Sequence, residues 1–141
     1  GLFLLLLMLG STVAYGVLRA MPQPKSEEIE IPSQNIIDYE LTSEQRRYLL
    51  RRGKTIVELE YSLACENCRD VKAKLESAAQ EFSDQMILVE LIVSDSNDLP
   101  IVRIESSYGR QSLSKPTDAE IMDAFCDLFV NPPLRCATRN I

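Results

Sequence analysis

Four cysteines carry most of the chemistry that this sequence offers, and they fall into two pairs, Cys65 with Cys68 and Cys126 with Cys136. The 141 residues include no histidine, which excludes Ser-His-Asp and Cys-His catalytic groups and any histidine-ligated metal site. Thiolates are nucleophiles that exchange with disulfides, and carboxylates are the other reactive groups present. The sequence therefore points to sulfur or carboxylate chemistry, with no resident metal or cofactor expected.

The first pair forms the motif Cys65-Glu66-Asn67-Cys68 at the junction between a predicted strand and a predicted helix. A cysteine at a helix N-terminus faces unpaired backbone N–H groups and the positive end of the helix dipole, and both lower the pKa of its thiol. Cys65 is the expected attacking thiol, and Cys68, one turn inside the helix, is expected to resolve the mixed disulfide. Because Glu66 disfavours the Cys65 thiolate and Arg69 favours it, the net shift has no predictable sign.

Hydrophobic periodicity predicts the elements that position this motif. Thr55–Tyr61 alternates as a strand does, residues 68–85 have helical apolar spacing, and Met86–Val93 is a nearly continuous apolar run. These segments predict a parallel β-α-β unit whose strand ends and helix start meet at one edge of a sheet. Capping and turn signals predict the remaining elements: a helix between Thr42 and Gly53, a hairpin with strands 101–106 and 111–113, and a helix from Thr117 to just before Pro132.

Over residues 41–130 this arrangement resembles the thioredoxin-like superfamily, which includes thioredoxins and glutaredoxins. The resemblance rests on Cys65 and Cys68 after a strand, and on Leu99-Pro100 ahead of a later strand, a hairpin and a final helix. It implies that the peptide bond before Pro100 is cis and that Pro100 packs beside the cysteine pair as part of the catalytic site. It also implies that the backbone of Leu99 contacts the substrate.

The sequence departs from the family pattern at two places that bear on the site. Ala64, the other expected substrate contact, stands where thioredoxins often have an aromatic residue. Five polar residues, Ser94 to Asp98, replace the helix that usually leads to the proline strand. The predicted fold class is therefore α/β, a trimmed thioredoxin-like fold with a central mixed sheet of about four strands flanked by helices.

The second pair, Cys126 and Cys136, has the character of a structural disulfide. Such a bond would tether the tail Leu134–Ile141 to the final helix and contribute about 2–3 kcal/mol through chain entropy. An even number of cysteines, with one redox-type and one structural-type pair, favours an oxidising compartment. A four-cysteine zinc site is the alternative, but the second pair lacks the spacing of a zinc knuckle.

The charged residues suggest no further catalytic site. Glu58 and Glu60 lie on one side of a predicted strand, and we expect them on its exposed face rather than in acid-base chemistry. A solvated helix face stabilised by the helix dipole is expected for the first helix, in preference to a lipid-binding or partner-binding role for its arginines Arg46, Arg47, Arg51 and Arg52.

The N-terminal segment differs in composition from the rest of the chain. No residue from Leu2 to Leu18 is charged, and this stretch corresponds to about 25 Å of helix, close to the minimum for crossing a bilayer. A removed signal peptide is the alternative interpretation. The expected organisation is a transmembrane helix over residues 1–20 in contact with the lipid bilayer, an extended linker over 21–40, and a thioredoxin-like domain over 41–141.

Charge and cysteine content also bear on location and partners. The formal net charge of −6, without a basic stripe, argues against nucleic-acid binding. Arg19 and Lys25 favour a cytoplasmic domain by the positive-inside rule, whereas the cysteines favour an extracytoplasmic one and receive more weight here. We therefore expect a single-pass protein of the cell membrane with an extracytoplasmic domain.

Two functions fit these observations. The first is a membrane-anchored thiol-disulfide oxidoreductase that acts on protein cysteines through Cys65 and Cys68. The second is a non-catalytic accessory subunit of a multi-subunit membrane protein complex, in which both cysteine pairs are structural disulfides. Protein substrates or partner subunits are expected in either case.

Overall fold

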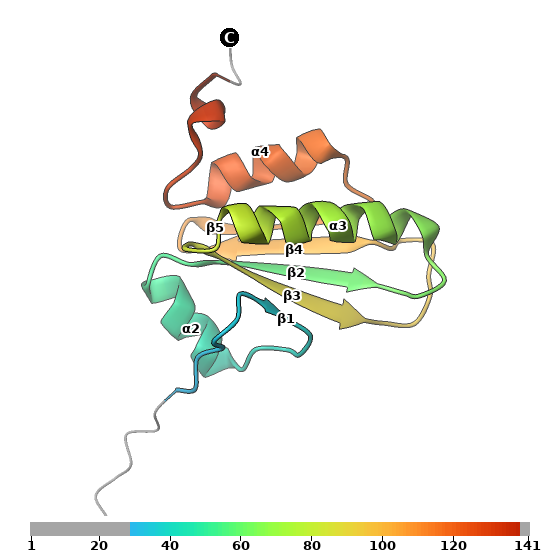
Figure 1. The fold of residues 1–141 in the computed structure, drawn as a ribbon, viewed down its shortest axis with the longest axis horizontal. Coiled ribbons are helices and arrows are strands. Elements are labelled where there is room, and N and C mark those ends of the chain that lie inside the picture. Colours follow the sequence, from blue (N-terminus) through green and yellow to red (C-terminus); the bar gives the residue numbers. More distant parts are fainter. Residues whose placement is uncertain (1–28, 139–141) are drawn as a thin grey trace, which may run out of the picture.

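A computed structural model describes residues 29–138, which form a five-stranded sheet with helices on both faces (Figure 1). Two helices, α3 and α4, cover one face, and α2 lies against the other. Along the chain the elements are β1 (Ile36–Ile37), α2 (Ser43–Arg51), β2 (Thr55–Tyr61), α3 (Glu66–Glu81), β3 (Met86–Ile92), β4 (Ile101–Ser106), β5 (Gly109–Ser114), α4 (Asp118–Leu128) and the short 3₁₀ helix η1 (Leu134–Thr138).

The sheet is mixed and has the strand order β1-β3-β2-β4-β5. Strand β3 pairs in parallel with both β1 and β2, whereas β2 with β4 and β4 with β5 are antiparallel. The expected count of about four strands is corrected to five by β1, which lies in the segment predicted as a linker. Ile36 and Ile37 form only two pairs, with Leu88 and Val89, and two residues are too few to show alternation in a sequence.

Local signals account for the ends of the helices. Both predicted capping boxes are present, Thr42 with Gln45 at α2 and Thr117 with Glu120 at α4. The last helix ends at Leu128, earlier than predicted, because the backbone of Phe129 is already extended. Helix α3 has no side-chain cap, and its N-cap residue is Cys65. The helix that carries the cysteine pair therefore begins with N–H groups that no side chain at the cap position satisfies.

Two hydrophobic clusters hold the layers together. Val57 and Leu59 of β2 pack with Leu75 and Phe125 beneath α3 and α4, in the larger cluster. The smaller cluster lies beneath α2 and includes Ile56, the β2 neighbour of Val57 that points to the other face. The alternation predicted for β2 is thus present, but both faces of this central strand are largely buried.

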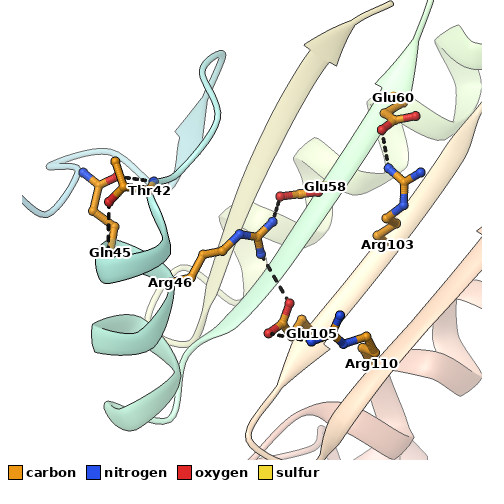
Figure 2. Close-up of polar contacts among 8 residues, drawn as sticks. All are labelled: Thr42, Gln45, Arg46, Glu58, Glu60, Arg103, Glu105 and Arg110. Carbon is orange, nitrogen blue, oxygen red and sulfur yellow. Dashed lines mark hydrogen bonds and ion pairs between the residues drawn. The ribbon is translucent and has the colours of Figure 1, made fainter.

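Glu58 departs from its expected exposure on the α2 side of the sheet (Figure 2). Only 7% of this residue is exposed, and its carboxylate forms an ion pair with Arg46 of α2. The guanidinium of Arg46 also donates to Glu105 Oε2 of β4 over 3.3 Å. Arg46 is consequently a bridge between α2 and the sheet, not part of a purely solvated helix face.

Within residues 29–138, no helix is long and apolar enough to cross a membrane. The transmembrane helix predicted for residues 1–20 lies outside the residues that the structure describes, as does the first part of the predicted linker.

Candidate active site

The cysteine pair lies where β2 passes into α3. Strand β2 ends at Tyr61, and four residues later Cys65 adopts an extended backbone, with φ −84° and ψ 110°, at the N-cap of α3. The Cys65 N–H donates to the carbonyl oxygen of Ser62 over 3.3 Å, which closes this turn. The β-α-β unit therefore brings Cys65 to the end of the sheet at which the parallel strands β2 and β3 have their C-termini.

Cys65 and Cys68 form a disulfide with a Cα–Cα distance of 5.4 Å. Their exposure differs, because Cys65 is half-buried whereas Cys68 is 2% exposed. Cys65 is therefore the more accessible cysteine of the pair, and Cys68 is buried within the first turn of α3. This asymmetry suits an attacking thiol at Cys65 and a resolving thiol at Cys68.

Leu99 and Pro100 lie beside this pair. Their peptide bond is cis, and the carbonyl oxygen of Leu99 lies 3.8 Å from Cys65 Sγ. Both residues are buried, so Leu99 presents its backbone to the site rather than its side chain. The Lys115 N–H donates to the Pro100 carbonyl over 2.8 Å and so connects the end of β5 to the start of β4.

The order of features along the chain now matches the one that supported the sequence resemblance. A β-α-β unit carries the cysteine pair at its helix start, and a cis-proline precedes the β4–β5 hairpin and the final helix α4. The chain has a thioredoxin-like fold. Its strand β1 adds to the elements that the sequence predicted, and the segment from Ser94 to Asp98 is a loop, as expected for a trimmed version.

The chain is similar in fold to several solved structures. No protein-family model matches the chain, and no curated protein matches it in sequence. The thioredoxin Deadhead of Drosophila melanogaster is 16% identical over 57% of this chain and 86% of its own, with a TM-score of 0.46. The Fasciola hepatica thioredoxin is 14% identical over 57% and 88%, with a TM-score of 0.45. The first thioredoxin domain of mouse protein disulfide-isomerase A4 is 16% identical over 73% and 82%, with a TM-score of 0.39.

The turn before Cys65 forms the exposed part of the thioredoxin-like site. Ala64, the predicted substrate contact, is exposed there. Its neighbour Leu63 is 79% exposed, and Ile92 at the end of β3 is 63% exposed. Sequence reasoning did not select Leu63 or Ile92, although an apolar residue in a turn next to a cysteine motif is a usable signal. Both are large apolar side chains that are exposed where the parallel strands end.

Two side-chain hydrogen bonds hold the loop that leads to the cis-proline. Ser62 Oγ donates to Asp95 Oδ1 over 2.7 Å, which joins the turn before Cys65 to this loop. Ser114 Oγ donates to the Asp98 carbonyl over 2.7 Å and ties the far end of the loop to β5. These contacts fix Leu99 beside the cysteines without the helix that thioredoxins usually have there.

Glu90 of β3 is the ionisable group that sequence reasoning missed near this site. It is 8% exposed and lies on the face covered by α3, where Lys72 Nζ is 3.6 Å from its Oε2. Burial, with a further contribution from Glu76, raises the pKa of Glu90 from 4.5 to about 7. Glu90 in turn raises the pKa of Lys72, which lies one turn beyond Cys68 on α3. The sequence showed only a charge within an apolar strand, and its burial depends on α3.

The second cysteine pair lies away from this end of the sheet. Cys126 of α4 and Cys136 of η1 form the predicted disulfide, with a Cα–Cα distance of 5.5 Å. Arg135 beside it donates to Glu81 over 3.2 Å, at the end of α3 opposite the Cys65–Cys68 pair. Since all four cysteines are in two separate disulfides, they are not gathered as the alternative zinc site requires.

Proposed function

We propose that the chain is a thiol-disulfide oxidoreductase that acts on protein cysteines, anchored in a membrane by residues 1–20 with its domain on the extracytoplasmic side. The observation that carries the catalytic part is the Cys65–Cys68 disulfide at the start of α3. Cys65 is half-buried and its sulfur lies 3.8 Å from the Leu99 carbonyl oxygen, whereas Cys68 is buried.

In the reducing direction the reaction begins with both thiols free. The Cys65 thiolate attacks one sulfur of a substrate disulfide, so that a Cys65–substrate S–S bond forms and the other substrate sulfur leaves as a thiolate. Cys68 then loses its proton and attacks Cys65 Sγ, which forms the Cys65–Cys68 disulfide and releases the second substrate thiol. The substrate gains two electrons and the cysteine pair is oxidised. The oxidising direction runs through the same steps in reverse.

Neighbouring groups have distinct parts in this scheme. The uncapped N-terminus of α3 favours negative charge on Cys65, which stabilises both the attacking and the leaving thiolate. The Leu99 carbonyl, which lies 3.8 Å from Cys65 Sγ, is the proposed backbone acceptor for a substrate N–H. Leu63 and Ala64 offer apolar contact next to the attacked sulfur.

Two sequence features support the proposed location. The uncharged stretch from Leu2 to Leu18 has the length and composition of a membrane span. The Cys126–Cys136 disulfide has no part in the exchange scheme. Structural disulfides of this kind persist in oxidising compartments and are uncommon in the cytosol.

Trapping of the mixed disulfide tests the reaction. A Cys68→Ser variant should accumulate a covalent complex with a disulfide-containing test protein, because the resolving thiol is missing. The complex should dissolve on addition of dithiothreitol, and a Cys65→Ser variant serves as the matched control and should form none. A redox titration of the wild-type chain in glutathione buffers should give a measurable midpoint for the first pair.

The alternative function makes opposite predictions for the same measurements. In a non-catalytic accessory subunit, the first disulfide would stay closed in strong reductant and Cys68→Ser would trap no protein. Either result would contradict the oxidoreductase proposal and would favour a domain that only binds other proteins.

A further inference from the structure

The two edges of the sheet differ in length. The β1 edge consists of two residues, whereas β5 at the other edge extends over six, Gly109–Ser114. Strand β5 pairs with β4 on its inner side, and no other strand within residues 29–138 pairs with its outer side. The molecule therefore presents one edge that is long enough to accept a further strand.

The usual protections of a free edge are sparse along β5. Natural edge strands are commonly shortened, charged, bulged, interrupted by proline or covered by another element. The sequence of β5, GRQSLS, contains no proline, and Arg110 is its only charged residue. Four of its six residues are exposed, namely Gly109, Arg110, Ser112 and Ser114. The charge on this edge is therefore a single cation near one end.

The face next to this edge carries three arginines, Arg46, Arg103 and Arg110, of which Arg103 and Arg110 are the more exposed (Figure 2). A hollow of about 380 Å³ lies over β2, β4 and β5 on the α2 side, and its lining includes Arg103, Glu105, Arg110 and Ser112. The side chain of Glu105 is 25% exposed, whereas those of Arg103 and Arg110 are 46% and 81% exposed. A molecule that approaches the hollow from solvent meets the two arginines first.

Of these two arginines, Arg110 has the weaker contacts with carboxylates. Its guanidinium lies 3.9 Å from Glu105 Oε1, and Glu105 is also bound by Arg46 over 3.3 Å. Arg103, in contrast, forms an ion pair with Glu60 across the β2–β4 pairing. Most of the five N–H donors of Arg110 therefore remain free to bind a carboxylate.

We propose that the β5 edge is a docking site for an extended acidic segment of a partner protein. The segment would add to the sheet as a sixth strand, with main-chain hydrogen bonds to β5 and a carboxylate paired with Arg110 over the hollow. A second copy of this chain fits less well, because β5 has no acidic residue to offer to Arg110 when two β5 strands meet edge to edge.

The surroundings of the β5 edge are less acidic than the chain as a whole. The hairpin from Ile101 to Ser114 contains Arg103, Glu105 and Arg110 and so has a formal charge of +1, and the adjacent Arg46, Glu58 and Glu60 bring the local charge to zero, against −6 for the full sequence. At physiological salt the screening length is about 8 Å, so a bound segment senses mainly the charges of this hairpin and its immediate neighbours.

Binding of designed peptides to the full chain in a mild detergent tests this docking site. The probe is a fluorescent eight-residue peptide in which glutamate alternates with valine, followed by anisotropy at physiological salt. Two matched peptides are compared with it: one has lysine in place of glutamate, and the other keeps glutamate but is N-methylated at alternate backbone nitrogens. Only the unmethylated glutamate peptide should bind well, and it should slow hydrogen exchange along β5.

Charge reversal at Arg110 supplies the decisive variant. Arg110→Glu should weaken binding of the glutamate peptide by about tenfold or more and improve binding of the lysine peptide. Arg47→Glu makes the same charge change at an exposed position of α2 and should leave both affinities unchanged. Because neither cysteine of the first pair takes part, a Cys65→Ser/Cys68→Ser variant should bind the probe normally even if the oxidoreductase proposal fails.

Several results would overturn the docking proposal. Equal binding of the N-methylated peptide would mean that the attraction is electrostatic without strand addition. Unchanged binding by Arg110→Glu, or no binding of the glutamate peptide to the wild-type chain, would remove the site. If the chain formed a dimer and the glutamate peptide dissociated it, the natural occupant of the β5 edge would be a second copy of the chain and not an acidic partner.

Discussion

The two disulfides of this molecule are alike in span and opposite in surroundings. Their Cα–Cα distances are 5.4 Å and 5.5 Å, yet one lies at the uncapped start of α3 and the other joins α4 to a surface tail. Cys65 has the Leu99 carbonyl beside it and a buried partner in Cys68. Cys126 and Cys136 are both half-buried and lie far along the chain from these groups. The surroundings of a disulfide, and not the bond itself, therefore distinguish a reactive pair from a structural one.

Replacement of cysteines by serine should distinguish the two pairs most clearly through the rate of disulfide exchange. Cys65→Ser should lower the rate of disulfide exchange with a test protein by at least about 10³-fold, since the attacking thiolate is lost. The Cys126→Ser/Cys136→Ser variant should retain the exchange rate within about twofold, because neither sulfur lies at the site. Turnover of a fluorescent disulfide substrate measures both. Comparable losses from the two variants would refute a division of labour between the pairs.

The free energy of unfolding should depend more on the second disulfide than on the first. The cysteines of the second disulfide are separated by 10 positions in the sequence, and those of the first disulfide by 3. Chain entropy therefore predicts that the second bond stabilises the fold by about 3 kcal/mol and the first by about 2 kcal/mol. Urea denaturation should therefore give a larger decrease in the free energy of unfolding for Cys126→Ser/Cys136→Ser than for Cys65→Ser/Cys68→Ser. A larger decrease for the first pair would assign it the main structural role instead.

Much of the reactive region could be predicted from sequence because its signals are local. The C-x-x-C spacing, the capping boxes at Thr42 and Thr117 and the proline before a strand all lie within a few residues of what they determine. The parts that could not be predicted depend on distant segments. Strand β1 exists only through its pairing with β3, and the burial of Glu58 requires Arg46 from α2. The same holds for Glu90, whose environment is formed by α3.

Glu90, which contacts Lys72 of the helix that carries Cys68, allows a test based on the pH dependence of stability. The folded chain keeps the Glu90 proton up to about pH 7, whereas the unfolded chain releases it near 4.5. Between these values the folded state binds more protons, so this group's contribution to the free energy of unfolding falls as pH rises and levels off above pH 7. The difference between these two pKa values, which already includes the opposing effect of Lys72, corresponds to a decrease of at most about 3 kcal/mol.

A Glu90→Gln variant isolates this contribution. Relative to wild type it should gain up to about 3 kcal/mol of stability between pH 4.5 and pH 8, measured by urea denaturation, because glutamine stays neutral throughout. Glu44→Gln, at an exposed position in the first turn of α2, is the matched control and should follow the wild-type curve. Parallel curves for wild type and Glu90→Gln would show that the carboxylate is better solvated than its burial indicates.

The smallest effect concerns what the second disulfide holds in place. Arg135 donates to Glu81 over 3.2 Å, and its guanidinium lies 5.7 Å from the centre of the Phe82 ring. Exposed contacts of this kind contribute about 0.5–1 kcal/mol when the tail is already ordered. Arg135→Ala should cost this amount in the wild-type chain and clearly less in the Cys126→Ser/Cys136→Ser background, where ordering the tail would consume the gain. A double-mutant cycle measures the difference. Equal costs in both backgrounds would mean that the contacts of Arg135 place the tail without the bond, and that the disulfide only reinforces them.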